Sequence, residues 1–263
     1  MIRALFFDID GTLVSFNTHR IPESAVEALS AAKGKGLSIF ISTGRPWPMV
    51  NNVNNLADAG RYIDGYITVN GAYCFIGDRT VSITPIPEGD VALSVDKSDF
   101  YRYPILIVGK DRVAMRNGNE FASRIMSDIL NVGPELWSAP VEEVLSDDVL
   151  QLTPFVPEVG EAGFMEGLSG SHAARWHEAF IDVTANGADK GSAMETMCMA
   201  TGILPSQAMA FGDGGNDIAI IRKAGIGVAM GNASVYVKDA ADYVTRDVDS
   251  DGLYYALEHW NVI

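Results

Sequence analysis

The sequence is poor in three features that would each point to a particular class of protein. It holds 2 cysteines in 263 residues, Cys74 and Cys198, which cannot form a disulfide framework and lack the spacing of a metal site. Basic residues number 19 against 34 acidic ones, which argues against partners such as nucleic acid or an anionic membrane surface. Apolar runs end well short of a membrane span or a signal peptide. We therefore expect a cytoplasmic protein that binds neither nucleic acid nor membrane.

What is present is the composition of an ordinary folded chain. Hydrophobic residues make up 48% and charged residues 20%, which is enough apolar material for a sizeable core. The length fits two domains, or one large domain with an insertion. Short apolar runs at 2–8, 37–42 and 65–69 are typical of buried strands, and a helical pattern at 23–35 separates the first two. This alternation predicts an α/β fold with a doubly wound, mostly parallel, Rossmann-like sheet.

The regular alternation is interrupted in the middle of the chain. Residues 85–182 mix strand-like and helix-like segments without a strict order, which predicts an α+β insertion. After residue 183 the strands and helices alternate again. We therefore predict a catalytic core from 1–84 and 183–263, and an inserted cap at 85–182 that closes over the site and determines substrate specificity.

Polar side chains gather in four short segments at predicted strand ends or helix starts. Because ligands bind beyond the carboxyl ends of strands in such sheets, we expect these segments to meet at one surface. They are Asp8-Ile9-Asp10-Gly11-Thr12, Ser42-Thr43-Gly44-Arg45, Ala188-Asp189-Lys190-Gly191 and Gly212-Asp213-Gly214-Gly215-Asn216-Asp217.

The acidic members of these segments indicate a metal site. Asp8, Asp10, Asp213 and Asp217 would repel one another at short range, and some would take up protons unless a cation lay between them. Mg²⁺ suits carboxylates, a carbonyl, waters and a phosphate oxygen. We therefore expect Mg²⁺ as the cofactor.

The remaining members of the four segments suit a phosphate group. Lys190 and Arg45 add fixed positive charge, and Arg45 is expected at the substrate rim. Backbone amides around Gly11, Thr12 and Gly44, at helix starts, can bind phosphate oxygens. A metal, a carboxylate nucleophile and anion-binding groups are together what phosphoryl transfer through an aspartyl-phosphate requires.

The spacing of Asp8 and Asp10 has its own chemical sense. Residues two apart in an extended chain point the same way. One carboxylate can attack phosphorus while the other exchanges a proton with the oxygen on the opposite side of the phosphorus atom. Asp10 would protonate the leaving alcohol and later take a proton from the hydrolytic water.

The four segments, in this order and with a large insertion after the second, resemble the four motifs of the haloacid-dehalogenase superfamily of phosphatases. The arrangement is similar to that of the Cof-type (subclass IIB) sugar-phosphate phosphatases. This resemblance implies that Asp8 is the nucleophile and Asp10 the acid/base. It also implies that Thr43 and Lys190 hold the phosphate and that Asn216 touches it.

The same resemblance implies a ligand set for the metal. Mg²⁺ would be held by Asp8, by the main-chain carbonyl of Asp10 and by Asp213, while Asp217 would ligate the metal or support its shell. Individual residues also allow a purely structural interpretation, because Asp217 could cap a helix and Thr43 could be a turn hydroxyl.

One cluster in the insertion is a candidate for contact with the rest of the substrate. Arg175, Trp176 and His177 are adjacent, shortly before the chain returns to the core. An aromatic ring can stack on a sugar and a guanidinium can bind its oxygens. The alternative is an ordinary hairpin.

The C-terminal segment contains a pattern that misleads. Asp247-Val248-Asp249-Ser250-Asp251-Gly252, with Glu258 six residues later, matches a calcium-binding loop. Such a loop must follow a helix, whereas residues 242–245 are strand-like. We therefore expect a solvated acidic turn at the start of a helix.

The sequence thus predicts a monomeric Mg²⁺-dependent phosphatase whose partner is a small phosphorylated substrate, with sugar phosphates as the expected class. Two alternatives remain open. A sugar phosphomutase would pass through the same covalent state, and a sugar-phosphate sensor would bind without turnover. An intact set of Asp8, Asp10, Lys190 and Asp213 argues against the sensor.

Overall fold

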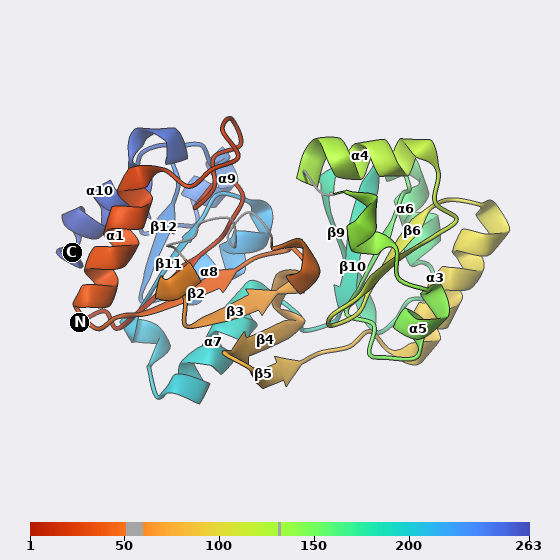
Figure 1. The fold of residues 1–263 in the computed structure, drawn as a ribbon, viewed down its shortest axis with the longest axis horizontal. Helices are drawn as coiled ribbons and strands as arrows, with labels where there is room; N and C mark the ends of the chain where they lie inside the picture. Colours follow the sequence, from red (N-terminus) through yellow and green to blue (C-terminus); the bar gives the residue numbers. More distant parts are fainter. Residues whose placement is uncertain (51–59, 131–132) are drawn as a thin grey trace. The chain divides into compact units, whose positions relative to one another are not determined.

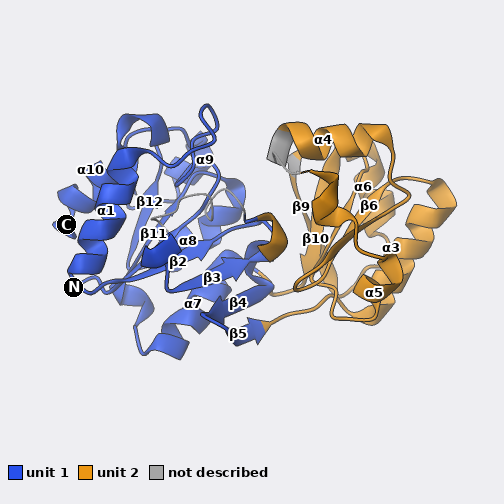
Figure 2. Cartoon of the chain, in the orientation of Figure 1, with its two compact units in different colours: residues 1–45, 50–82, 189–263 blue, residues 46–49, 83–188 orange. Residues whose placement is uncertain are grey.

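The computed structural model describes residues 1–50, 60–130 and 133–263; the side chains of Ile129, Leu130 and Trp176 are also outside this description. The chain divides into two compact units (Figures 1 and 2). Unit 1 comprises Met1–Arg45, Val50–Ser82 and Asp189–Ile263, and unit 2 comprises Pro46–Met49 and Ile83–Ala188. Within the described residues, no helix combines the length and the apolar character needed to span a bilayer.

Unit 1 is built on an eight-stranded sheet. From β13 to β3 every neighbouring pair of strands is parallel, and β4 runs antiparallel to β3. The chain moves outward from β1 toward β3 and, after the insertion, from β11 toward β13 in the opposite direction, so the strand order reverses between β1 and β11. The predicted doubly wound fold is confirmed, and the edge at which sheets of this kind bind ligands lies where β1 and β11 end. In spatial order the strands are β13 (Tyr243–Val244), β12 (Ile226–Ala229), β11 (Ala208–Gly212), β1 (Ala4–Phe7), β2 (Ser38–Ser42), β3 (Gly65–Thr68), β4 (Tyr73–Ile76) and β5 (Arg79–Ile83).

Helices cover both faces of this sheet, which explains why its central strands are mostly apolar. Phe6 of β1 and Phe40 of β2 stack with ring centroids 4.8 Å apart and pack with Met194 of α7. Leu5 and Phe7 point to the opposite face and are also fully buried. Among the described residues, the helices of unit 1 are α1 (Glu23–Gly34), α7 (Lys190–Thr201), α8 (Ile218–Lys223), α9 (Val235–Lys238) and α10 (Gly252–His259).

Unit 2 is an α+β unit that consists of a five-stranded antiparallel sheet and the helices packed on it. Its core lies on one face, where Ile107 of β6, Leu152 of β8 and Val183 of β10 pack with Phe164 of α6. The strands in spatial order are β7 (Val113–Arg116), β6 (Ile105–Val108), β8 (Gln151–Pro154), β10 (Phe180–Ala185) and β9 (Ser171–His177). The helices are α3 (Glu88–Tyr101), α4 (Glu120–Leu130), α5 (Val141–Leu145) and α6 (Glu158–Met165).

The observed units change at 82/83 and 188/189, whereas the sequence placed these changes at 84/85 and 182/183. The second difference has a clear cause. Val183 pairs with Leu152 of β8 and with Ala173 of β9, so it belongs to the sheet of unit 2. An apolar run in the sequence indicates a buried strand but not the sheet that the strand joins.

Helix α3 is the longest element that the sequence did not indicate. The residues that it buries are Asp90, Ser94 and Ser98, four apart and polar. Asp90 accepts hydrogen bonds from the main chain of Gly170 and from the hydroxyl of Ser171. A helix whose buried positions are polar has no apolar stripe, so periodicity cannot reveal it.

We predict opposite effects of two glycine substitutions in unit 1. Gly71 has φ +105°, and a Cβ there would lie 2.5 Å from the main-chain oxygen of Asp189. Gly71→Ala should therefore lower the free energy of unfolding by at least about 2 kcal/mol, through strain and displaced backbone. Gly34→Ala, in α1 with open space around it, should raise the free energy of unfolding by up to about 1 kcal/mol. Urea denaturation of both variants checks this, and equal stability would contradict it.

Candidate active site

A buried ammonium group brings two distant acidic residues together at the end of β1. Lys190 Nζ donates to Asp8 Oδ1 at 2.7 Å and to Asp217 Oδ1 at 2.6 Å. The Lys190 side chain is 0% exposed. Its backbone is fixed as the first residue of α7, whose N-cap Asp189 accepts a hydrogen bond from the main chain of Ser192. The Lys190 ammonium thus joins its own predicted segment to the segments that contain Asp8 and Asp217.

Asp217 organises the turn that follows β11. Its Oδ2 accepts hydrogen bonds from the main-chain N–H groups of Asp213 and Gly214, both at 3.0 Å. The Asp217 side chain lies so close to Gly212 that a Cβ there would be 2.3 Å from it. Both oxygens of Asp217 therefore have partners, which favours the supporting role over direct metal ligation.

The carboxylates of Asp8 and Asp213 have strongly perturbed pKa values. Burial raises the pKa of Asp8 well above its usual range, and the nearby Asp217 carboxylate raises it further, against the opposing effect of Lys190. Burial, followed by repulsion from Asp217, raises the pKa of Asp213 to about 7. Burial would lower the pKa of Lys190, but the carboxylates of Asp217 and Asp8 outweigh it, so this pKa is raised and the ammonium stays charged.

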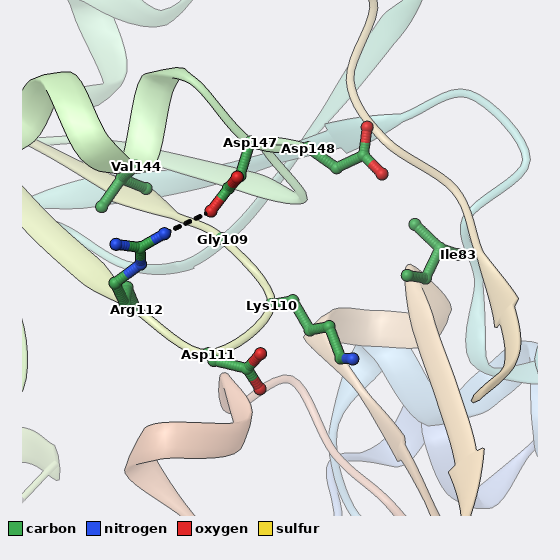
Figure 3. Close-up of a pocket in the computed structure, with 8 residues that line it drawn as sticks. All are labelled: Ile83, Gly109, Lys110, Asp111, Arg112, Val144, Asp147 and Asp148. Atoms are coloured by element: carbon green, nitrogen blue, oxygen red, sulfur yellow. Dashed lines mark hydrogen bonds and ion pairs between the residues drawn. The ribbon is translucent and has the colours of Figure 1, made fainter. Parts of the chain in front are cut away.

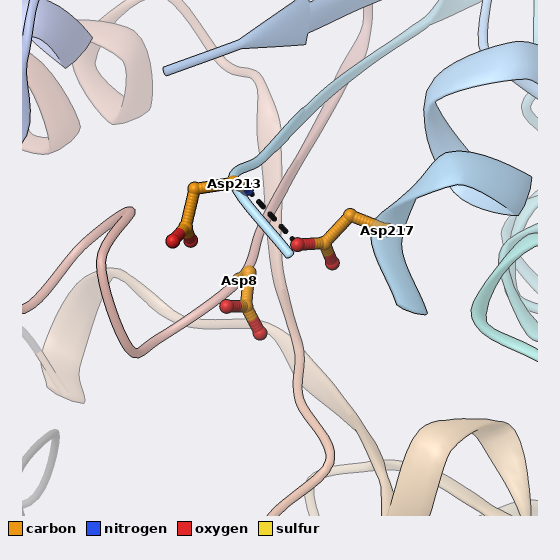
Figure 4. A group of neighbouring side chains, drawn as sticks. All are labelled: Asp8, Asp213 and Asp217. Carbon is orange, nitrogen blue, oxygen red and sulfur yellow. Dashed lines mark hydrogen bonds between the residues drawn. The ribbon is translucent and has the colours of Figure 1, made fainter. Parts of the chain in front are cut away.

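The same three carboxylates form an acidic group that suits a hard divalent cation. One oxygen each of Asp8, Asp213 and Asp217 lies within 4.8 Å of the others. Figure 4 shows the carboxyl groups of Asp213 and Asp217 on either side of that of Asp8. Thr12 Oγ1 donates to Asp213 Oδ1 at 2.9 Å and orients that side chain. A divalent metal would relieve the repulsion that raises the pKa values of Asp8 and Asp213.

A second group of polar atoms lies at the ends of β2 and β3. The main-chain N–H of Asn70 donates to the carbonyl of Thr43, and Asn216 Nδ2 donates to Asn70 Oδ1 at 2.9 Å. A Cβ on Gly44 would lie 3.0 Å from Asn70 Oδ1, so this turn is open because Gly44 has no side chain. The structure therefore brings together Thr43, Gly44 and Asn216, the predicted phosphate-binding residues other than Lys190.

Asn70 belongs to this group of polar atoms and was not predicted from the sequence. It adopts φ 52°, ψ 26°, the left-handed conformation that Asn tolerates better than most residues. The sequence showed it only as the first residue of an Asn-Gly turn after a strand. Its position at the carboxyl end of β3 was the signal that could have identified it.

Asp10 and Arg45 form an ion pair that the sequence did not predict. Arg45 Nε donates to Asp10 Oδ2 at 2.6 Å, and Arg45 Nη2 donates to Asp10 Oδ1 at 2.7 Å. The Arg45 side chain was expected at the substrate rim, but the structure places it against Asp10 with 5% of its surface exposed. The two residues approach because the turns after β1 and β2 are neighbours in the sheet.

The predicted cluster in the insertion lies on β9, a strand that forms a hairpin with β10. Arg175 and His177 belong to β9, and the side chain of Trp176 lies outside the described residues. Arg175 donates to Glu161 and to the main-chain oxygens of Val156, His177, Glu178 and Phe180. The ring of His177 stacks on Phe180 with centroids 5.1 Å apart. These contacts favour a structural role for Arg175 over the predicted contact with a sugar.

The acidic segment near the C-terminus fastens a loop of unit 1. As predicted, a strand, β13, precedes it and a helix, α10, follows it. Asp247 Oδ1 accepts a hydrogen bond from the main chain of Asp249, and Asp249 Oδ2 accepts one from Asn17 Nδ2 at 2.6 Å. Hydrogen bonds from Ser15 and Asn17 lower the pKa of Asp249. The calcium-like pattern thus has a structural use at the loop that follows Asp10.

Unit 2 contains a cavity of about 290 Å³ that holds none of the predicted site residues. Figure 3 shows it beside the turn between β6 and β7, where Arg112 forms an ion pair with Asp147 at 2.6 Å. Five of its eight lining residues are charged, and the two signs are mixed. The lining residues are Ile83, Gly109, Lys110, Asp111, Arg112, Val144, Asp147 and Asp148.

The fold and the acidic site define a class of enzyme. The chain matches the family model described as haloacid dehalogenase-like hydrolase over residues 5–257. It belongs to this family and is a phosphatase of the Cof type, subclass IIB. The resemblance seen in the four motifs is therefore confirmed.

Among solved structures, the chain is similar to the subclass IIB sugar phosphatase BT4131, with 44% identity, a TM-score of 0.91 and coverage of 99% of this chain and 100% of that chain. It is also similar to the phosphatase BT1666 from Bacteroides thetaiotaomicron, with 34% identity, a TM-score of 0.87 and coverage of 100% and 96%. The putative phosphatase YkrA of Bacillus subtilis is 27% identical over 268 residues, which cover 99% of this chain and 98% of YkrA.

The pKa of Asp213 predicts how the stability of the metal-free protein depends on pH. A carboxyl with pKa about 7 when folded and an ordinary value when unfolded binds its proton more tightly in the folded state. Its stabilising contribution is complete below the unfolded pKa and is lost as pH rises through about 7. The melting temperature in chelator should therefore fall between about pH 5 and about pH 8.

Two additions test the assignment of this effect to Asp213. Asp213→Asn should weaken the fall with pH, whereas Asp249→Asn, which changes an exposed carboxylate, should leave it unchanged. A divalent cation should restore the melting temperature at about pH 8, because a ligand that binds only the folded state stabilises it. The same pH dependence in Asp213→Asn and in the parent protein would contradict the assignment.

We predict that Arg175→Ala destabilises unit 2. It removes five hydrogen bonds that join β9, the following turn, Val156 and Glu161, and charge-assisted bonds of this kind suggest a loss of about 1.5–3 kcal/mol. Arg112→Ala is the control, because Arg112 is 43% exposed and its ion pairs should contribute at most about 1 kcal/mol. Denaturant titration measures both. Equal losses would contradict a structural role specific to Arg175.

Proposed function

We propose that the protein hydrolyses small phosphomonoesters, with sugar phosphates as the preferred class, through an aspartyl-phosphate on Asp8 with Mg²⁺ as cofactor. The observation that carries this proposal is the position of Asp8. Its carboxylate accepts a hydrogen bond from the Lys190 ammonium and lies within 4.8 Å of an oxygen of Asp213, at the edge of the sheet where the strand order reverses. A nucleophile, a cation and a metal-ligating group thus converge.

In the first half-reaction, a carboxylate oxygen of Asp8 attacks phosphorus and the ester P–O bond breaks. Among the described residues Oδ2 of Asp8 has no hydrogen-bond partner, whereas Oδ1 is held by Lys190. Asp10 donates the proton that the leaving alkoxide needs. The open turn at Thr43 and Gly44, with Asn216 beside it, receives the oxygens of the phosphoryl group.

In the second half-reaction, water attacks the phosphorus of the aspartyl-phosphate. Asp10 takes a proton from this water, the bond between Asp8 and phosphorus breaks, and inorganic phosphate leaves. The Asp8 carboxylate is restored, and so is the proton that Asp10 gave to the alcohol. The Lys190 ammonium faces Asp8 throughout and balances its negative charge.

Asp8 and Asp213 are the side chains that would hold Mg²⁺, with Asp217 behind them. When bound, the ion would neutralise charge on the phosphoryl oxygens and on the attacking carboxylate. Two features support a hard cation here: the donor atoms are all oxygens, and burial and repulsion raise the pKa values of Asp8 and Asp213 in its absence.

Sugar phosphates are proposed as substrates because the structure that is 44% identical is described as a sugar phosphatase. The role of the insertion as a cap that selects the substrate, with His177 and Trp176 near the sugar, remains a prediction. So do a monomeric state and a cytoplasmic location.

Phosphate release from a panel of sugar phosphates, with Mg²⁺ or with chelator, tests the proposed function. We expect release that depends on Mg²⁺ and is strongest for some hexose or pentose phosphates. Asp8→Asn should lower kcat by more than ~10³-fold with the fold intact, because an amide is a poor nucleophile and a weak metal ligand. Asp249→Asn together with Asp251→Asn is the matched control and should keep nearly full activity. Substantial turnover by purified Asp8→Asn would rule out the nucleophile assignment.

The same assay separates the two alternatives. A phosphomutase would convert one sugar phosphate into an isomer with little free phosphate. A sensor would bind the sugar phosphate without turnover. Inorganic phosphate and an isomeric sugar phosphate can both be followed by phosphorus NMR in one reaction.

A further inference from the structure

Arg45 holds Asp10 by both carboxylate oxygens. Its Nε and Nη2 donate to the two oxygens at 2.6 and 2.7 Å, in the two-pronged geometry that only a guanidinium provides. The Arg45 side chain is 5% exposed and that of Asp10 is 29% exposed. The ion pair is therefore shielded on the side of Arg45 and open to solvent on the side of Asp10.

The backbone of Arg45 is itself tied to the phosphate-binding turn. Its N–H donates to Thr43 Oγ1 at 3.1 Å, and its carbonyl accepts from the N–H of Val69 at 3.2 Å. The guanidinium thus starts from a fixed point at the ends of β2 and β3. A carboxylate that binds the Arg45 guanidinium therefore takes a fixed position relative to Thr43 and Gly44.

The main chain around Asp10 is fixed, but its hydrogen bonds do not orient the Asp10 carboxylate. Gly11 follows directly with φ +83°, and its N–H donates to the carbonyl of Val14 at 2.8 Å. The Gly11 carbonyl is held by Asn232 Nδ2 at 2.8 Å, which fixes the turn but not the Asp10 side chain. The orientation of the Asp10 carboxylate therefore depends on Arg45.

We infer that Arg45 is the positioning residue for Asp10 and not a substrate-binding residue. This inference rests on the proposed function, in which Asp10 exchanges a proton with the leaving oxygen and with water. A carboxylate has about four lone-pair sites, and the guanidinium takes two of them. The others stay available for the proton, while the fork keeps the carboxylate plane constant through both half-reactions.

Two cations of the site, Arg45 beside Asp10 and Lys190 beside Asp8, differ in how strongly they orient the carboxylate that they bind. An ammonium is a point charge that allows its partner to rotate, whereas a planar guanidinium fixes the plane of its partner. Arg45→Lys therefore keeps the charge and removes the orientation. This makes it the variant that separates a positioning effect from a simple charge effect.

A double-mutant cycle tests the inference with Arg45→Gln, Arg45→Lys, Asp10→Asn and the double variant Arg45→Gln with Asp10→Asn. For a preferred sugar phosphate, Arg45→Gln should lower kcat by ~10–100-fold, within the range that acid/base residues contribute. Arg45→Lys should recover less than half of this loss on a logarithmic scale. In the Asp10→Asn background, Arg45→Gln should cost less than a further ~3-fold, because coupled residues are not additive.

Inhibition by inorganic phosphate provides the readout that a substrate-binding role would change. The inhibition constant of Arg45→Gln should stay within ~3-fold of the parent value if Arg45 acts through Asp10, and rise by ~10-fold or more if it binds the phosphoryl group. A crystal structure of Arg45→Gln should show the Asp10 carboxylate turned away from its parent position. Melting curves show that each variant is folded.

Three results would overturn the inference: losses that multiply in the double variant, a large rise in the inhibition constant, or an Asp10 carboxylate that keeps its position without Arg45. Failure of the proposed function looks different. In that case the parent protein releases no phosphate, or Asp8→Asn retains activity. The crystal structure of Arg45→Gln still decides whether Arg45 positions Asp10.

Discussion

The buried ammonium of Lys190 is the interaction on which the rest of the site depends. Asp8 and Asp217 are nearly inaccessible to water, and two buried carboxylates without a cation would carry a large desolvation cost and repel each other. The ammonium is supplied by α7, which follows the inserted unit, whereas Asp8 lies near the N-terminus. The site therefore exists only when the N-terminal and C-terminal segments of unit 1 have folded against each other, as they do where Phe6, Phe40 and Met194 pack together.

Around this cation, two carboxylates that are two residues apart have different partners and therefore different properties. Asp8 is buried and faces a point charge, which leaves one of its oxygens available for reaction. Asp10 is more exposed and is held by a planar fork. The alternation of an extended chain gives both residues the same direction, but neighbouring elements of the sheet decide what each one contacts. One short motif can thus supply two carboxylates for two tasks.

The two units bury different kinds of residue, and this decides how well each one can be predicted from the sequence. Unit 1 buries both faces of a mostly parallel sheet, so its central strands are nearly continuous apolar runs and could be predicted closely. Unit 2 has a helix, α3, that buries Asp90, Ser94 and Ser98, and an Arg175 that serves five internal acceptors. Buried polar residues cannot be told from surface residues in a sequence, so only the outline of the insertion could be predicted.

The sequence by itself determined the doubly wound class, the interruption by an α+β insertion and the residues of the four motifs, because strand periodicity and short motifs are local properties. The tertiary structure decided which partners these residues have. Arg45 contacts Asp10, Asn70 joins Asn216, Asp217 uses both oxygens on Lys190 and the turn after β11, and Asp249 fastens the loop at Asn17. Each pair joins strand ends or loops from different parts of the chain. Their distance depends on sheet order and register, which no local pattern encodes.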